Sequence, residues 1–362
     1  FPYPIVGKAT AEPGMKYIPF EEKTLEKGML MPAFPASRKL CAIGGMVANN
    51  GAGEKSLKYG QNKDFVDSLK VVLSDNNEYE ICPLRYSELQ KLISEDHFYA
   101  HLVNEVYLLI KENWSLVQEK RPKTAKNSAG YLLWDVISAS TIEDFENGEG
   151  FFDLTKLIVG AQGTTGIITE ITYKLVPHED KEELLVMFVN DIHQLPKIVD
   201  VLKEYDLETI ELYDDNTFNI GVRFFGDFIK DKGFLKALRY SLRFLPELWM
   251  VLTGGVPKFI VLAESVDMDS SVVHKEVVSE LESIQKELPK MKSFVVRGKD
   301  NAQKYWDFRH DSFKLLTEHS IKTRETGKGT RTAPFIDDIA VPPEFLDRYI
   351  PELVEILDEY RE

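Results

Sequence analysis

Two glycine-rich stretches contain the residue types best suited to hold a phosphate group or a flat ring. The first, CAIGGMVANNGAGEKSLKYG, occupies residues 41–60, and the second, GAQGTTGIIT, occupies residues 160–169. Without a Cβ, backbone amides approach phosphates and ring edges closely. Neither stretch matches the GxGxxG fingerprint or the Gly-Lys-Ser/Thr of a P-loop. Either stretch alone could be a tight turn in a strand-rich domain, so the case for a ligand depends on the two together.

The other residues that could do chemistry are weaker candidates. His97 and His101 are spaced four apart on a predicted helix, which is a metal-capable spacing, but the HExxH pattern is absent. We expect them to be helix-surface histidines and predict no metal site. Asp337 and Asp338 are adjacent in a predicted strand, so their side chains point to opposite faces and do not form a metal pair.

Composition narrows the class of protein. With 59 acidic and 44 basic residues the formal net charge is -15, which disfavours binding to nucleic acid and to anionic membrane surfaces. The most apolar stretch, FLPELWMVLTGGVPKFIVLA, is broken by Pro, Gly and Glu, so we predict no transmembrane segment.

Cys41 and Cys82 form no CxxC pair. We therefore expect a reducing compartment, with the protein cytoplasmic or peripheral at the inner face of the membrane.

The first half of the chain reads as a mixture of strands and helices that would position the glycines. The spacing of apolar residues predicts a strand at 5–12 and a helix at 18–29 that is stopped by Gly28. A hairpin follows at 65–81, around an Asp-Asn-Asn turn, and residues 86–122 are predicted to be helical. Residues 153–177 read as a strand, a glycine-rich turn and a second strand.

The second half repeats one architectural unit. Strand, helix and strand are predicted at 182–190, 191–206 and 208–215, and again at 258–267, 270–288 and 292–298. Two such βαβ units in series predict a ferredoxin-like split βαβ sandwich, with helices over one face of the sheet. Since 362 residues exceed one ordinary core, we predict two domains, 1–178 and 179–362.

Several motifs together resemble the FAD-linked oxidase family, which includes vanillyl alcohol oxidase and D-lactate dehydrogenase. Residues 32–76 resemble its flavin-binding segment, and DLTKLIVGAQGTTGIIT resembles its second flavin turn, usually G-S-E-G-T-L-G-I-I-T. The likeness extends to KNSAGYLLWDV, ETIELYDD, YWDFRHDSF and PFIDDIAVPPEF. It implies an α+β fold, with a partial PCMH-type FAD-binding domain followed by a ferredoxin-like cap domain, and FAD as the cofactor.

The resemblance also implies which residues bind the cofactor. No His or Cys stands where the family attaches its flavin covalently, and Cys41 reads as a small buried residue. The implied contacts with the ribityl chain, pyrophosphate, ring and adenine side come from Pro35, Ser37, Ile43, Gly44, Gly45, Asn49, Asn50, Gly53, Gly163, Thr164, Gly166, Ile167 and Ile168.

The resemblance further implies the substrate residues. Arg309 of YWDFRH matches the arginine that relatives use to hold a carboxylate, a task that suits a planar fork of donors. Asn127 and Tyr131 lie in a segment that faces the flavin in relatives. A lysine that some relatives carry is Ile336 here, and the nearest cations, Lys328 and Arg331, are only loosely placed. Arg309 as a surface arginine and 126–131 as a plain loop remain the alternatives.

The predicted function is hydride transfer from a D-2-hydroxy acid, such as lactate, glycolate or 2-hydroxyglutarate, to the flavin, with electrons passed on to an iron–sulfur domain or a quinone. The alternatives are an alcohol or sugar oxidase of the same family, and a non-catalytic FAD-binding or electron-transfer module. The family's first phosphate loop and its His-rich Gly-Asp-Gly-Asn segment are not found here. We therefore expect a fragment cut at both ends, which binds FAD poorly and lacks the catalytic histidines.

Overall fold

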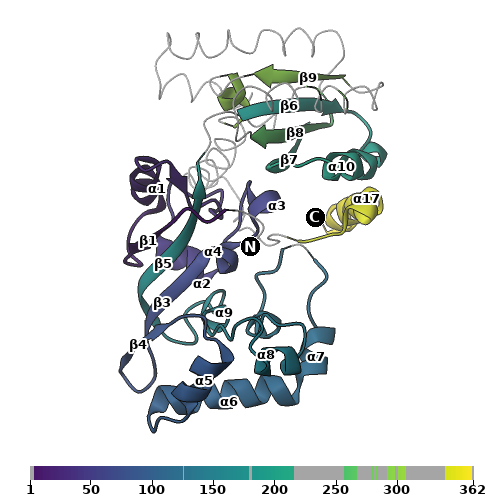
Figure 1. Ribbon diagram of the computed structural model, residues 1–362. Coiled ribbons are helices and arrows are strands. Elements are labelled where there is room, and N and C mark those ends of the chain that lie inside the picture. Colours follow the sequence, from purple (N-terminus) through teal and green to yellow (C-terminus); the bar gives the residue numbers. More distant parts are fainter. Residues whose placement is uncertain are drawn as a thin grey trace, which may run out of the picture. The chain divides into compact units, whose positions relative to one another are not determined.

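The computed structural model divides the chain into two compact units, Phe1–His178 and Glu179–Glu362. It describes residues 4–124, 126–178, 182–215, 257–266, 279, 283, 292–297, 301–306 and 339–360. The predicted helix at 270–288 lies outside these ranges except at 279 and 283. The two units are described separately below (Figure 1).

The first unit is built on an antiparallel sheet. Its strand order is β1-β5-β3-β4, and β2 pairs with an end of β5. The hairpin predicted at 65–81 is confirmed, and Asn76 in its turn has φ +64°. The strands are β1 Gly7–Ala11, β2 Met29–Leu30, β3 Val66–Val72, β4 Glu78–Ile81 and β5 Ile167–Pro177.

The long strand β5 organises the core of this unit. Ile171, Tyr173 and Leu175 alternate along it and are fully buried or nearly so, as the period of a strand requires. The helix α1 (Tyr17–Leu25) packs on this face, where the ring of Phe20 lies 6.0 Å from that of Tyr173. This apolar face fixes the register of β5, and with it the position of the glycine-rich turn that precedes the strand.

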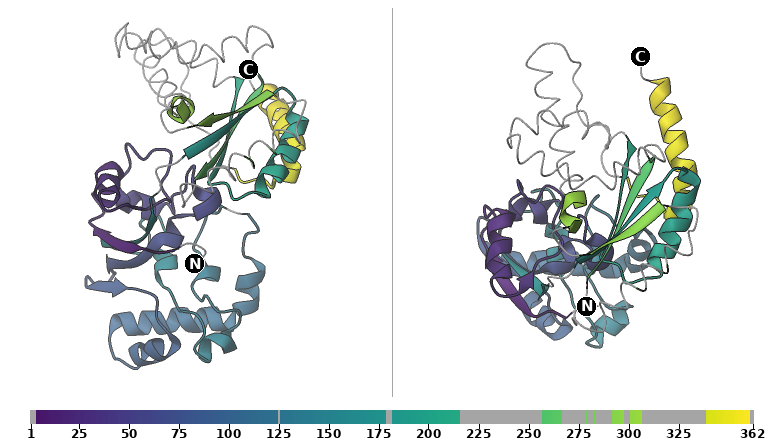
Figure 2. Two further views of the ribbon diagram at one scale, coloured as in Figure 1. Left: turned by 45° about the horizontal axis from the view of Figure 1, so that its top comes forward. Right: turned by 90° about the horizontal axis from the view of Figure 1, so that it is seen from above.

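The helical region predicted at 86–122 is confirmed, but it consists of three helices. These are α5 (Tyr86–Ile93), α6 (Phe98–Glu112) and α7 (Trp114–Glu119), and they lie together at the end of the unit away from α1 (Figures 1 and 2). The first break arises because His97 adopts an extended conformation and its Nδ1 accepts a hydrogen bond from the amide of Ala100. A new helix therefore begins there.

Two expectations for the first unit are wrong. The segment 153–159, read as a strand, contains the short helix α9 (Thr155–Ile158). Asp153 starts it by accepting hydrogen bonds from the amide and hydroxyl of Thr155. The first glycine stretch, read as a turn, contains the helix α2 (Ile43–Ala48), whose glycine at 44 permits close packing on Pro13. The remaining helices of the unit are α3 (Ser56–Tyr59), α4 (Asn62–Phe65), η1 (Leu133–Asp135) and α8 (Ile142–Glu146).

The second unit confirms the split βαβ arrangement. Its antiparallel sheet has the strand order β7-β8-β6-β9, built from β6 (Glu182–Val189), β7 (Thr209–Asp214), β8 (Phe259–Val266) and β9 (Lys292–Arg297). Both faces of β6 are buried, which explains its continuous apolar run. The helices α10 (Leu195–Lys203) and α17 (Leu346–Glu359) lie side by side along the sheet (Figure 2), with η2 (Ile192–Gln194) and η3 (Pro343–Phe345) beside them.

Candidate cofactor site in the first unit

The two glycine-rich stretches meet in the folded chain. The amide of Gly160 donates to the carbonyl of Val47, and the amide of Gln162 donates to the carbonyl of Ala48, each at 2.9 Å. These carbonyls belong to the last turn of α2, where helical carbonyls lack a partner within the helix. The second stretch therefore completes the end of the helix formed by the first, and two segments more than a hundred residues apart share one surface.

Asn50 is the buried centre of this junction. It is fully buried and has φ +47°, a left-handed conformation that asparagine tolerates better than most residues. Its Nδ2 donates to the carbonyl of Asn127 at 3.1 Å, and its Oδ1 accepts from the amide of Lys63 at 3.0 Å. A Cβ on Gly160 would lie 3.3 Å from the Asn50 Cβ. The predicted contact of Asn50 with a cofactor stays a prediction, since its side-chain amide is already bonded inside the unit.

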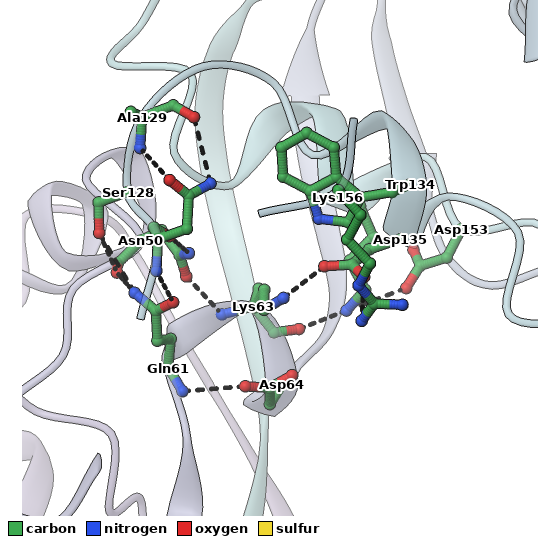
Figure 3. Close-up of polar contacts among 12 residues, drawn as sticks. Asn50, Gln61, Lys63, Asp64, Ser128, Ala129, Trp134, Asp135, Asp153 and Lys156 are labelled. Carbon is green, nitrogen blue, oxygen red and sulfur yellow. Dashed lines mark hydrogen bonds and ion pairs between the residues drawn. The ribbon is translucent and has the colours of Figure 1, made fainter. Parts of the chain in front are cut away.

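Gln61 is a functional residue that the sequence reading missed. Only 3% of it is exposed, and its Nε2 donates to the Asn50 carbonyl at 3.1 Å and to the Ser128 hydroxyl at 3.2 Å. Its Oε1 accepts from the amide of Asn127 at 2.9 Å. The whole side-chain amide is thus used to join the first glycine stretch to the segment 127–128 (Figure 3). Gln61 also begins α4, where its backbone amide donates to Asp64 Oδ2 at 2.9 Å.

Tyr131 and Asn127, both predicted as catalytic residues, border the same junction. The Tyr131 hydroxyl lies 2.8 Å from the Thr164 Oγ1 in the second stretch, and 47% of Tyr131 is exposed. Asn127 is half-buried and forms a local turn, in which its Oδ1 accepts from the amide of Ala129 at 3.3 Å. The segment 127–131 is therefore held at both ends, by Gln61 and by Thr164.

Five of the eight glycines in the two stretches divide into two groups. Three of them lack a Cβ because the chain itself fills the space: the added atom would lie 2.6 Å from the Pro13 Cβ at Gly44, 2.1 Å from the Phe34 carbonyl oxygen at Gly53, and 2.6 Å from a Val71 methyl at Gly166. At Gly45 and Gly163 the added atom would meet nothing within 4 Å. These two glycines leave backbone open on the surface.

Unused polar groups lie at the open positions. In the described part of the chain, the amides of Gly45 and Gly163 have no hydrogen-bond partner. The hydroxyl of Thr165 is buried and also has none. Gly163 has φ +79°, which turns the backbone where a side chain would be strained. Free amide donors on open backbone fit a ligand that carries a pyrophosphate and a flat ring.

Of the other residues predicted to bind the cofactor, some are exposed and some are packed inside the unit. Asn49 lies one helical turn after Gly45 and is exposed, as are Ser37, Thr164 and Ile167. Pro35 lies against Gly53, since the atom added at Gly53 would be 3.2 Å from the Pro35 Cα. Ile168 is half-buried on β5. Ile43 is fully buried, so its side chain belongs to the core.

Cys41 lies at the start of the first glycine stretch, and His97 and His101 lie at the start of α6. Burial raises the pKa of the Cys41 thiol, which therefore stays protonated at neutral pH. His97 bonds to Glu95 and His101 to Asp96, each at 3.0 Å, so each imidazole has its own carboxylate. Within the described ranges, no group of three His, Cys, Asp or Glu side chains is arranged to hold a metal ion.

The predicted substrate cation lies outside the described residues. Arg309 falls in this category, as do Lys328, Arg331, Ile336, Asp337 and Asp338. Among the residues that the structure does describe, none of the helices combines the length and apolar character needed to span a bilayer.

Two family models match the chain. A model described as "FAD binding domain" matches residues 5–81, which include the first glycine stretch. A model described as "FAD linked oxidases, C-terminal domain" matches residues 179–361, half of the chain. Both models agree with the resemblance noted from the motifs.

Curated relatives share low identity with this chain. A protein of Pantoea ananatis named D-2-hydroxyglutarate dehydrogenase is 22% identical over 88% of this chain and 29% of its own length. The glycolate oxidase subunit GlcD of Bacillus subtilis is 27% identical over 58% of this chain and 32% of its own length. The chain thus spans about a third of the length of these relatives.

A solved structure shares the fold. An alkyldihydroxyacetonephosphate synthase superposes with a TM-score of 0.54 and 13% identity, covering 86% of this chain and 43% of its own. At this identity the similarity supports the architecture alone.

Proposed function

Because the chain belongs to the FAD-linked oxidase family and has FAD as its cofactor, we propose that it carries out the oxidation of a D-2-hydroxy acid. Lactate, glycolate and 2-hydroxyglutarate are the candidate substrates, and two of these occur in the names of the relatives. The proposal concerns the whole protein, since the chain spans only about a third of the length of these relatives.

The observation that carries the cofactor part of this proposal is the junction of the two glycine stretches. It supports a role for the open amides of Gly45 and Gly163 as donors to the phosphates of FAD. When bound, FAD accepts the hydride from the α-carbon of the substrate. The chain's own residues bind it, shield it and orient the substrate.

The substrate part depends on three further residues. Tyr131 and Asn127 stand at the edge of the junction and would touch the substrate or the ring. Arg309 would hold the substrate carboxylate through a bidentate ion pair. Such an ion pair would hold the α-carbon of the substrate in one position, and this orientation lowers the barrier to hydride transfer.

The test is anaerobic reduction of the purified protein loaded with FAD. We expect D-lactate, glycolate or D-2-hydroxyglutarate to bleach the flavin absorbance. Arg309→Glu is expected to abolish bleaching while FAD stays bound, and Arg348→Glu, a reversal at an exposed arginine of α17, is the matched control. A flavin that stays oxidised with all three acids, or bleaching that survives Arg309→Glu, would contradict the hydroxy-acid proposal.

A further inference from the structure

A second concave site lies on the other side of Lys63 from the glycine junction. It is a cavity of about 450 Å³ within the first unit, formed by α4, α7, η1, α9 and the segment 137–140. Its chemical character comes from three cations, Lys63, Arg121 and Lys156, and from two indoles, Trp114 and Trp134. None of the residues predicted to bind the cofactor or substrate lines it.

The three cations are held in place by carboxylates. Asp135 accepts a hydrogen bond from Lys63 Nζ through Oδ2, and its Oδ1 forms an ion pair with the Arg121 guanidinium at 3.2 Å. Lys156 Nζ bonds to the Lys63 carbonyl and lies 3.3 Å from Asp153 Oδ2 (Figure 3). The Lys63, Lys156 and Asp135 side chains are less than one-fifth exposed. The two lysine charges are therefore preorganised, which lowers the entropy lost when a ligand binds, while the Arg121 side chain is 54% exposed.

The cations have donors to spare. The cavity lining contains three positive groups and two carboxylates, Asp64 and Asp135, while Asp153, the partner of Lys156, is not part of the lining. The Asp64 carboxylate accepts a hydrogen bond from the amide of Gln61 at the start of α4. Among the described contacts, Lys63 Nζ has one acceptor and Arg121 bonds through a single nitrogen. Several N–H groups thus remain for an anion with more than one oxygen, such as a phosphate.

The indoles supply a surface for a flat ring. Trp114 and Trp134 are both half-buried, and Gln118 fixes the second by donating to its carbonyl at 3.4 Å. In Figure 3 the Trp134 ring lies beside Lys156 and Asp135, so apolar and charged walls meet in one cavity. Half-buried aromatic rings next to cations suit a ligand with a planar ring at one end and negative charge at the other.

From this combination we propose that the cavity binds a mononucleotide, with its base against the indoles and its phosphate on Lys63, Arg121 and Lys156. A volume of about 450 Å³ is within the range of small-ligand sites. The site is separate from the cofactor site, and does not depend on which hydroxy acid is oxidised.

Lys63 links the two sites physically. Its side chain lines the cavity, while its amide donates to Asn50 Oδ1 at the centre of the glycine junction, at 3.0 Å. A ligand that binds Lys63 therefore acts on a residue that also fixes the junction. Occupancy of the cavity is expected to shift the affinity for FAD, and FAD to shift the affinity of the cavity by the same factor.

The test is calorimetric titration of the FAD-saturated protein with AMP, adenosine and inorganic phosphate. We expect AMP to bind at one site per chain and more tightly than either of its halves. Arg121→Gln should weaken AMP roughly tenfold, as expected for one charge-assisted hydrogen bond. Trp134→Leu should weaken adenosine and AMP but not phosphate. The matched control is Lys120→Gln, which removes a neighbouring exposed cation that does not line the cavity.

Three results would overturn the proposal. The first is no binding of AMP to the FAD-saturated protein while the FAD-free protein binds it, since the cavity would then belong to the cofactor site. The second is no binding to either form. The third is an AMP affinity that Arg121→Gln and Trp134→Leu both leave unchanged in variants with wild-type thermal unfolding.

Discussion

The two neighbouring glycines of α2 have opposite roles, and the same contrast recurs in the second stretch. At Gly44 a methyl group would collide with Pro13, while at Gly45 it would point into open space beside an unused amide. In the second stretch a Cβ at Gly166 would collide with Val71, so we call this glycine closed. A Cβ at Gly163 would meet nothing within 4 Å, so we call that glycine open. Glycine density in a sequence thus combines two signals, one for close packing of the chain on itself and one for a bound ligand.

The contrast predicts that closed glycines control folding and open glycines control FAD binding. Substitutions by alanine separate the two, because alanine adds only the Cβ. The variants below are ordered from the largest expected change in the free energy of unfolding to the smallest, except that Gly44→Ala is placed last beside Gly45→Ala for comparison.

Gly53→Ala should have the largest effect on stability. Its Cβ would lie 2.1 Å from the Phe34 carbonyl oxygen, which is backbone and cannot turn aside. We expect a loss of about 3 kcal/mol, the upper end for overpacking, measured by urea unfolding. Wild-type stability in this variant would show that the backbone at 34–35 yields, and would break the distinction between closed and open glycines.

Gln61→Leu should destabilise the junction itself. The apolar side chain, one heavy atom smaller than glutamine, leaves the part-buried Asn127 amide without its acceptor and removes one of two donors from the Asn50 carbonyl. The expected loss is about 2 kcal/mol. Hydrogen exchange should show faster opening of 126–131 than in Gln90→Leu, the same change at an exposed position of α5. Equal exchange in the two variants would contradict the role assigned to Gln61.

The junction also marks the limit of what the sequence predicts. Alternating or continuous apolar residues were enough to predict β5, the hairpin β3–β4 and the four strands of the second unit. The segment 153–159 misled the reading, because its apolar run resembles a strand and the cap formed by Asp153 was not weighed. The contacts of Gln61 were not predictable, since they depend on a loop 66 residues away.

The location of the candidate site was predictable from the sequence, but which of its residues pack inside the unit and which remain open to a ligand was not. The motifs indicated both glycine stretches and the segment 127–131, which the fold brings together. The spacing of residues in the sequence could not show that the Asn50 side chain hydrogen-bonds to Asn127, or that Pro13 leaves no room for a Cβ at Gly44. Those facts depend on which distant segment packs against each residue, and one sequence does not contain that information locally.

Gly163→Ala should separate backbone strain from cofactor binding. Alanine at φ +79° costs about 1 kcal/mol, because the left-handed region disfavours a Cβ. Gly148, with φ +100° and nothing within 4 Å, is the matched control, since Gly148→Ala carries a similar strain far from the junction. Both variants should lose similar stability in urea unfolding, and only Gly163→Ala should bind FAD more weakly. Equal FAD affinity in the two would remove Gly163 from the site.

The most direct test of the central claim is an FAD titration of Gly45→Ala beside Gly44→Ala and the wild-type protein. Gly45→Ala should raise stability by about 0.5 kcal/mol, because alanine favours a helix, and should still weaken FAD binding at least tenfold by covering the open amide. Gly44→Ala should lower stability by about 2 kcal/mol through its clash with Pro13. Wild-type FAD affinity in a stably folded Gly45→Ala protein would contradict the account, because the open glycine would then have no part in holding the cofactor.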